Sequence, residues 1–276
     1  SQRKEGWRVR IIIEKDYAGV SRRAADFVEA LLRRKPNAVL GLATGSTPLG
    51  LYRELIRRHK DEGLDFSGVT TFNLDEYYGL APDHPQSYHH FMRVNLFDHI
   101  NVPGDNINIP SGTAKNIAKS CDDYERKIRE FGGIDLQILG IGSDGHIAFN
   151  EPGSSLASRT RPKTLAPETI RDNARFFGEG EEVPKFAITM GVGTILESAA
   201  CLLLATGKGK ARILAEAVEG PVTSQVTASA LQLHPHAIVI SDDEAASCLK
   251  RRAYYEHVER VSSEFGGKAD TRPWSR

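Results

Sequence analysis

Short apolar runs rich in β-branched residues alternate with helical patterns along the chain, and this alternation restricts the fold more than any other feature. The predicted strands cover residues 9–13, 38–43, 69–76, 134–142, 185–190, 200–206 and 237–242. One predicted helix ends near residue 35, and another begins at residue 47. The other predicted helices cover residues 87–97, 116–131, 210–218 and 244–261. Strands that alternate with helices form a parallel sheet with helices on both faces. We therefore expect an α/β fold with a single doubly wound, mostly parallel, Rossmann-like sheet.

The composition is that of an ordinary globular protein with no electrostatic preference for polyanions. In 276 residues, 36 Lys and Arg balance 36 Asp and Glu, so we expect neither nucleic acid nor a membrane surface as a partner. The longest apolar runs, such as residues 199–205, are too short to span a bilayer. Cys121, Cys201 and Cys248 are widely spaced, which favours reduced thiols and a cytoplasmic location.

A glycine-containing turn, ATGSTP (43–48), joins a predicted strand to a predicted helix. Free backbone N–H groups at a helix start can bind phosphate. We expect Thr47 to be the N-cap and Pro48 the first helical residue. The turn is not a Walker P-loop, because no lysine follows Gly45. A plain capped turn remains the alternative to a phosphate site.

A second turn, TGKGKAR (206–212), repeats this arrangement with Lys208 and Lys210. A cation beside a helix N-terminus is unfavourable unless an anion is also present. The pattern therefore favours an anion site about as strongly as it favours a solvated lysine.

Two adjacent carboxylates, Asp75 and Glu76, end a predicted strand in LDEYYG (74–79). Side chains of successive strand residues point to opposite faces, so only one of the two can face a cleft. An aspartate at a strand end is commonly a cap or a turn former. Beside a phosphate site, Asp75 becomes a candidate general base.

The segment GIGSDGHIAFNEP (140–152) gathers Asp144, His146 and Glu151 at the end of a strongly apolar run. A carboxylate that accepts from one imidazole nitrogen fixes the tautomer and favours the charged ring. A metal site is disfavoured, because no second histidine follows at HxxxH or HxH spacing. Taken alone, this segment is most simply a structural loop, and a set of proton-transfer groups without a metal is the alternative.

Several motifs together resemble the glucosamine-6-phosphate deaminase family, also called glucosamine-6-phosphate isomerase. The resemblance covers nearly the whole chain from Val9 to the last predicted helix. Its most specific part is DGHIAFNEP with SSLASRTR. The motifs are LDEY (74–77), GIGSDGHIAFNEP (140–152), SSLASRTR (154–161), RFF (175–177), MGVGTI (190–195) and LQLHPHA (231–237).

The resemblance implies an enzyme of amino-sugar catabolism that converts glucosamine 6-phosphate and water into fructose 6-phosphate and ammonia, without metal or organic cofactor. It implies Asp75 as the base that moves a proton from C2 to C1 of the open-chain sugar. His146 would open the pyranose ring, supported by Asp144 and Glu151. The implied phosphate-binding residues are Thr44, Gly45, Ser46, Thr47, Arg175 and Lys210. The loop at Lys210 differs in length from the family pattern, so Lys208 remains an alternative.

The resemblance also implies a homo-oligomer, a hexamer, with an effector site between subunits for N-acetylglucosamine 6-phosphate. The residues that map onto this site are Ser154, Arg161, Lys163, Thr164 and Tyr254. A solvated basic loop is the alternative for the segment RTRPK. Regulated members use their terminal amine in the pocket, whereas residues 1–8 here form an extension. We therefore expect weakened or absent activation, with one domain over residues 9–262 and a polar tail over residues 263–276.

Two other functions remain open from the sequence. A 6-phosphogluconolactonase-type hydrolase has a similar fold and a related DGH segment, but LDEY and FNEP favour the deaminase. A non-catalytic sugar-phosphate sensor would need a DNA-binding module or a basic patch, and neither is recognisable in the sequence.

Overall fold

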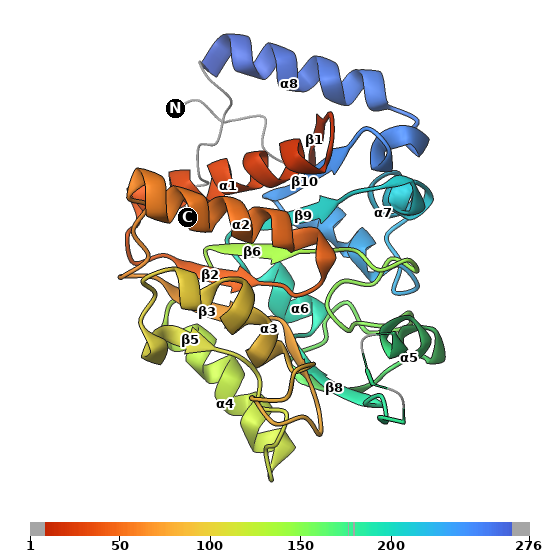
Figure 1. The fold of residues 1–276 in the computed structure, drawn as a ribbon. Coiled ribbons are helices and arrows are strands. Elements are labelled where there is room, and N and C mark those ends of the chain that lie inside the picture. The colour runs from red at the N-terminus through yellow and green to blue at the C-terminus, as the bar shows by residue number, and fades with distance from the viewer. Residues whose placement is uncertain (1–8, 176, 179, 267–276) are drawn as a thin grey trace.

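Seven parallel strands form the central sheet of the computed structural model, which describes residues 9–175, 177–178 and 180–266 (Figure 1). In spatial order they are β1 (Arg10–Glu14), β10 (Ala237–Asp242), β9 (Cys201–Ala205), β6 (Leu136–Leu139), β2 (Val39–Leu42), β3 (Thr70–Asn73) and β5 (Ile107–Asn108). Each neighbouring pair runs parallel. The predicted doubly wound parallel sheet is therefore confirmed.

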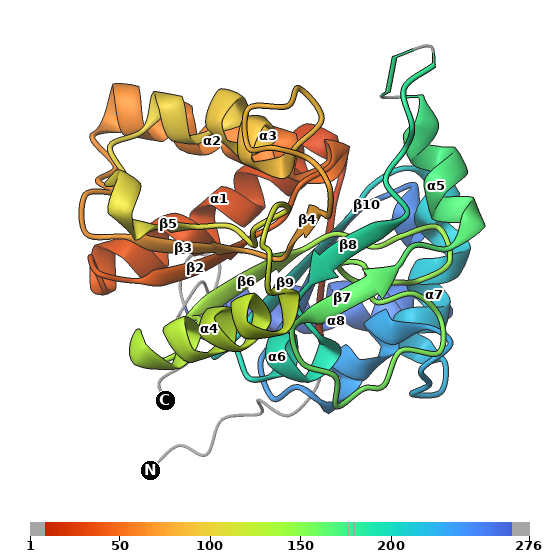
Figure 2. The same ribbon diagram turned by 90° about the horizontal axis from the view of Figure 1, so that it is seen from below.

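Helices cover both faces of this sheet (Figure 2). The helices are α1 (Tyr17–Arg34), α2 (Ser46–Glu62), α3 (Tyr88–Asn95), α4 (Ile117–Glu130), α5 (Pro167–Ala174), α6 (Val192–Leu196), α7 (Ala211–Glu219) and α8 (Arg252–Gly266). One apolar core lies between the sheet and α1, α2 and α3, and a second lies between the sheet and α4, α6 and α7. Short 3-10 turns are η1 (Phe97–His99), η2 (Gly104–Asn106), η3 (Lys208–Lys210), η4 (Thr227–Leu233) and η5 (Ala245–Cys248). No helix in these described ranges is long and apolar enough to cross a membrane.

A second, smaller sheet was not predicted. It is antiparallel, and its strands in spatial order are β4 (Asp75–Tyr77), β8 (Phe186–Thr189) and β7 (Arg161–Thr164). The prediction of one strand over residues 69–76 is wrong, because the chain changes sheets at Leu74. The N–H of Leu74 donates to Leu42 in the central sheet, whereas its carbonyl accepts from Met190 beyond β8. Residues 69–78 contain no glycine or proline, so no turn signal marks this junction in the sequence.

Two predicted helix starts are also wrong. Helix α2 begins at Ser46, with Gly45 as a cap that makes no side-chain bond, so Thr47 is not the N-cap. Gly45 has φ +101, and this glycine conformation turns the chain into the helix without a capping side chain. The last helix begins at Arg252, because Asp242 accepts from the N–H of Ala245 and holds a turn first. The predicted extension 1–8 and most of the predicted tail lie outside the described residues.

Candidate active site

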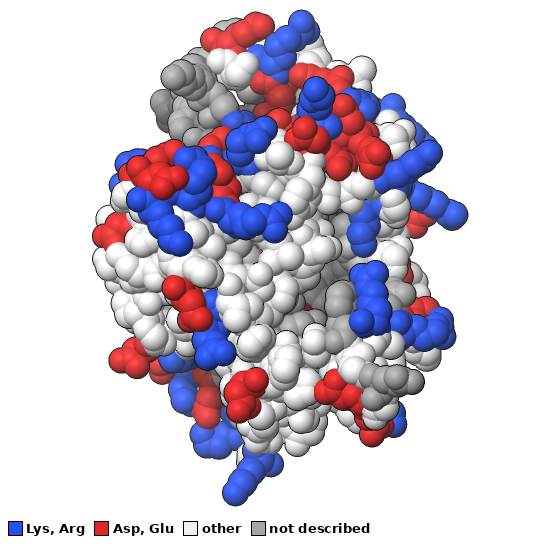
Figure 3. Space-filling view, viewed as in Figure 1, with Lys and Arg blue, Asp and Glu red and all other residues white. Residues whose placement is uncertain are grey.

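A cleft of about 440 Å³ lies at the carboxyl ends of several strands of the central sheet. Its walls come from the turn after β2, the start of β4, the loop after β6, Lys210 after β9, and α5. Figure 3 shows this side of the molecule hollowed right of centre, with Lys and Arg side chains near the rim. Ligands of open α/β sheets bind at this edge, because the strands end and the loops diverge there.

Asp75 lies in the wall of this cleft with only 6% of its surface exposed. Burial, with a smaller contribution from the charge of Glu76, raises the pKa of Asp75 to about 8. A carboxyl group with this pKa can both remove and return a proton near neutral pH.

Glu76 points away from the cleft and binds the start of α3. Its carboxylate accepts from the backbone N–H groups of Tyr77, Tyr88 and His89, and contacts His89 Nδ1 at 2.8 Å. The N-terminal dipole of α3 favours this negative charge. The two adjacent carboxylates thus point to opposite sides of the strand, as its geometry requires. Of the two, only Asp75 lines the cleft.

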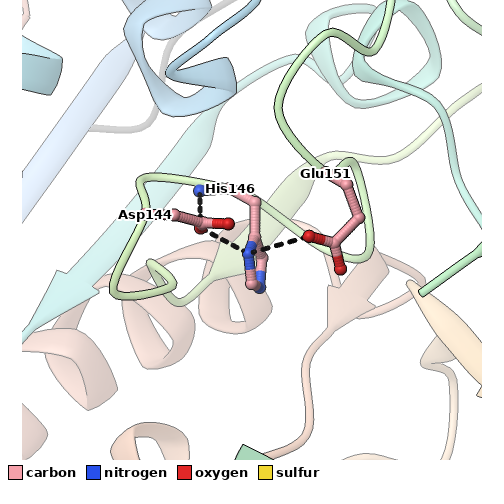
Figure 4. A group of neighbouring side chains, drawn as sticks. All are labelled: Asp144, His146 and Glu151. Atoms are coloured by element: carbon pink, nitrogen blue, oxygen red, sulfur yellow. Dashed lines mark hydrogen bonds and ion pairs between the residues drawn. The ribbon is translucent and has the colours of Figure 1, made fainter. Parts of the chain in front are cut away.

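Asp144, His146 and Glu151 meet in the loop after β6 (Figure 4). His146 Nδ1 lies 2.6 Å from Asp144 Oδ1 and 4.0 Å from Glu151 Oε2. Burial opposes ionisation of Asp144, but its contacts with His146 prevail and lower its pKa. The imidazole ring packs over Gly142, where a Cβ atom would approach the ring to 2.4 Å. Glycine is therefore required at position 142 for the ring to occupy this place.

The same three residues could hold a metal ion, since their ligand atoms lie within 4.8 Å of one another. However, the 2.6 Å between His146 Nδ1 and Asp144 Oδ1 is shorter than the roughly 3.3 Å between two ligands of tetrahedral zinc at 2.0 Å. The spacing fits a carboxylate–imidazole pair better than two metal ligands.

The far end of the cleft collects groups suited to an anion. Residues 44–47 present the N-terminus of α2, and Arg175 and Lys210 also line the cleft. Lys208 is exposed and is absent from the cleft lining, and its N–H donates to Glu244. Asp242 accepts from the N–H of Gly207 and so holds the loop that carries Lys210.

Helix α5 contributes cleft residues that the sequence did not reveal. Glu168, Thr169 and Asn173 line the cleft, as do Tyr88, Ser143 and Phe149 from other segments. A short helix with mixed polarity gives no periodic signal that would identify its inward face.

The residues mapped to the effector site divide into two groups. Arg161, Lys163 and Thr164 lie on β7, and Arg161 donates to Asn150 at 2.9 Å. Ser154 lies in the loop before this strand, where its N–H donates to the carbonyl of Glu151. Tyr254 is exposed on α8, which packs beside β1. In Figure 1, α8 lies at the top, far from β8 and the small sheet. Within one chain the structure does not bring Tyr254 to the other four residues.

Comparison with known proteins identifies the family. The model for glucosamine-6-phosphate isomerases/6-phosphogluconolactonase matches residues 15–245. The chain belongs to this family.

Curated relatives in the family are named glucosamine-6-phosphate deaminase. The protein of Hahella chejuensis is 55% identical over 94% of this chain and 99% of its own length. That of Thermoanaerobacter pseudethanolicus is 52% identical over 87% of this chain and 95% of its own length. A solved monomeric glucosamine-6-phosphate deaminase has a TM-score of 0.85 and 45% identity, covering 87% of this chain and all of that chain. A 6-phosphogluconolactonase from Trypanosoma cruzi has a TM-score of 0.69 at 23% identity, over 90% of this chain and all of that one, and so shares the fold alone.

The raised pKa of Asp75 predicts a pH-dependent stability in this family member. Between about pH 4 and 8 the folded state keeps a proton on Asp75 that the unfolded chain has lost. The contribution of this group to folding stability therefore falls as pH rises through that window, by at most about 1.4 kcal/mol per pH unit. Asp75→Asn should lack this slope. When the pH is raised from 5 to 8, urea unfolding should show the variant gaining stability relative to wild type. Equal changes in the free energy of unfolding of both proteins would contradict the raised pKa of Asp75.

Proposed function

We propose that this protein deaminates and isomerises glucosamine 6-phosphate, giving fructose 6-phosphate and ammonia. The observation that carries the proposal is the arrangement of the cleft: the buried Asp75 carboxyl, the Asp144–His146 pair and the cations Arg175 and Lys210 line one cavity, and Glu151 lies beside His146. The deaminase relatives, more than 50% identical over most of the chain, support the same reaction.

In this proposal the phosphate end anchors the substrate. The N-terminus of α2 and the cations of Arg175 and Lys210 bind the phosphate group. His146 then transfers a proton between the ring oxygen and the C1 hydroxyl, so that the pyranose opens to the aldehyde. Asp144 keeps the imidazole oriented through the 2.6 Å contact, and Glu151 Oε2 lies 4.0 Å from the same nitrogen.

Asp75 acts on the open chain. Its carboxylate removes the proton from C2 and returns it to C1, and a second proton passes from the amine nitrogen to O1. The aldehyde and amine are thereby converted into an imine at C2 and a hydroxyl at C1. Water adds at C2, the C–N bond breaks, and ammonia leaves with fructose 6-phosphate. One carboxyl can serve both carbons because they are adjacent and the phosphate holds the chain in place.

Paired assays separate this function from the lactonase alternative. We expect ammonia and fructose 6-phosphate from glucosamine 6-phosphate, and little hydrolysis of 6-phosphogluconolactone at equal enzyme concentration. Lactone hydrolysis without ammonia release would overturn the proposal in favour of the hydrolase. Binding of both sugar phosphates without turnover of either would instead favour the sensor.

We further propose that the protein is a cytoplasmic homo-hexamer that binds N-acetylglucosamine 6-phosphate between subunits. Arg161 and Lys163 would supply the cations and Ser154 a hydroxyl, and the buried Ser154 Oγ has no hydrogen-bond partner among the described residues. Three unpaired cysteines suit a reducing compartment. The expected weakness of activation depends on residues 1–8, which are not described.

Light scattering and substrate titration test the regulatory proposal. We expect a hexamer whose half-saturating substrate concentration falls less than about 5-fold, the lower end of typical couplings, when N-acetylglucosamine 6-phosphate is added. Arg161→Ala should abolish that shift. A monomer, as described for the solved relative, would exclude an intersubunit site in this protein.

A further inference from the structure

Helix α5 connects the end of the cleft that carries Arg175 to the group formed by Asp144, His146 and Glu151. Arg175 directly follows the helix and lines the cleft. Two turns earlier, Thr169 Oγ1 donates to Glu151 Oε1 at 2.8 Å. The helix packs on a small apolar cluster that includes Phe149, two residues before Glu151, and contacts Ile170. A displacement of α5 would therefore act on Glu151 directly.

The hydroxyl of Thr169 binds one oxygen of the Glu151 carboxylate. Both residues are buried, with 8% of Thr169 and 4% of Glu151 exposed. Thr169 holds one carboxylate oxygen, while the other, Oε2, has no hydrogen-bond partner among the described residues and lies 4.0 Å from His146 Nδ1. Without the Thr169 hydroxyl, rotation of the carboxylate would no longer be restrained toward the imidazole.

We propose that Thr169 is a positioning residue that makes the ring-opening group depend on the position of α5. A phosphate bound to Arg175 restrains the end of α5, the helix restrains Thr169, and Thr169 directs Glu151 Oε2 toward His146. The inference rests on the proposed function, because it assigns to Thr169 a role in the ring-opening step of that reaction. It does not make Thr169 a group that touches the substrate.

The test compares Thr169→Val, which removes the hydroxyl at constant shape, with Thr169→Ser, which retains it. We expect kcat to fall about 10- to 100-fold in Thr169→Val, the scale of a misplaced proton-transfer group, while KM changes less than about 3-fold. Thr169→Ser should recover most of the loss. Arg171→Ala, an exposed change on the same helix, is the control and should behave as wild type.

A deuterium label locates the affected step. If ring opening is slowed, substrate deuterated at C2 should show a smaller isotope effect on kcat in Thr169→Val than in wild type. In a Glu151→Gln background, Thr169→Val should cause little further loss, because the two residues act as a unit. This second comparison holds even if the single variant is less stable.

Three results would overturn the proposal: a wild-type kcat in folded Thr169→Val, an equal loss in Thr169→Ser, or losses that multiply in the double variant. Wild-type enzyme that releases no ammonia would instead refute the proposed function. The two failures are therefore distinguishable.

Discussion

Asp75→Asn should lower turnover of glucosamine 6-phosphate by roughly 100-fold or more, the contribution typical of a positioned general base. The amide has the shape of the carboxyl but cannot accept the C2 proton. The measurement is steady-state ammonia release, together with exchange of the C2 proton with deuterated solvent. Both should fall by the same factor, because both require removal of that proton.

The matched control is the neighbouring carboxylate. Glu76→Gln removes a charge that faces α3 and not the cleft. It should therefore lower the free energy of unfolding more than it lowers the turnover of the folded protein. The pKa of about 8 for Asp75 also predicts that kcat/KM rises with pH up to that region in wild type. Near-normal exchange at C2 in folded Asp75→Asn would remove Asp75 from this role.

Lys210→Ala and Arg175→Ala should each weaken substrate binding by about 1.5 to 3 kcal/mol, the typical contribution of a charge-assisted hydrogen bond. Such a loss corresponds to a roughly 10- to 150-fold increase in the dissociation constant. Glucosamine without phosphate should be a very poor substrate for wild type. The measurement is calorimetric titration with a non-reacting sugar phosphate.

Lys208→Ala is the matched control for this loop. Lys208 is exposed and is not part of the cleft lining, so its removal should leave affinity within a factor of about two, since exposed ion pairs contribute little. If Lys208→Ala weakens substrate binding and Lys210→Ala does not, the phosphate is bound by Lys208.

The sequence was sufficient to predict the order of most elements and the place of the candidate site. Apolar periodicity locates β2, β6, β9 and β10, and parallel strands necessarily bring their carboxyl ends to one edge. Asp144, His146 and Glu151 lie within eight residues of one another, so one loop after β6 can gather them.

Other features depend on contacts that no local pattern encodes. The transfer of the chain from β3 to β4 is set by Leu74, which bonds to both sheets. Strand β7 carries Arg161, Pro162 and Lys163, a polar stretch that pairs only because β8 lies beside it. The contact of Thr169 with Glu151 joins residues 18 positions apart through a short helix. Tertiary packing decides such features, and local propensity does not.

Conversion of glucosamine 6-phosphate in deuterated water, followed by proton NMR, tests the central claim most directly. If one carboxyl serves both carbons from one side, ammonium and fructose 6-phosphate form in equal amounts, and any deuterium enters only one of the two C1 positions. Failure to form these products, or deuterium spread over both C1 positions, would contradict a single base at Asp75.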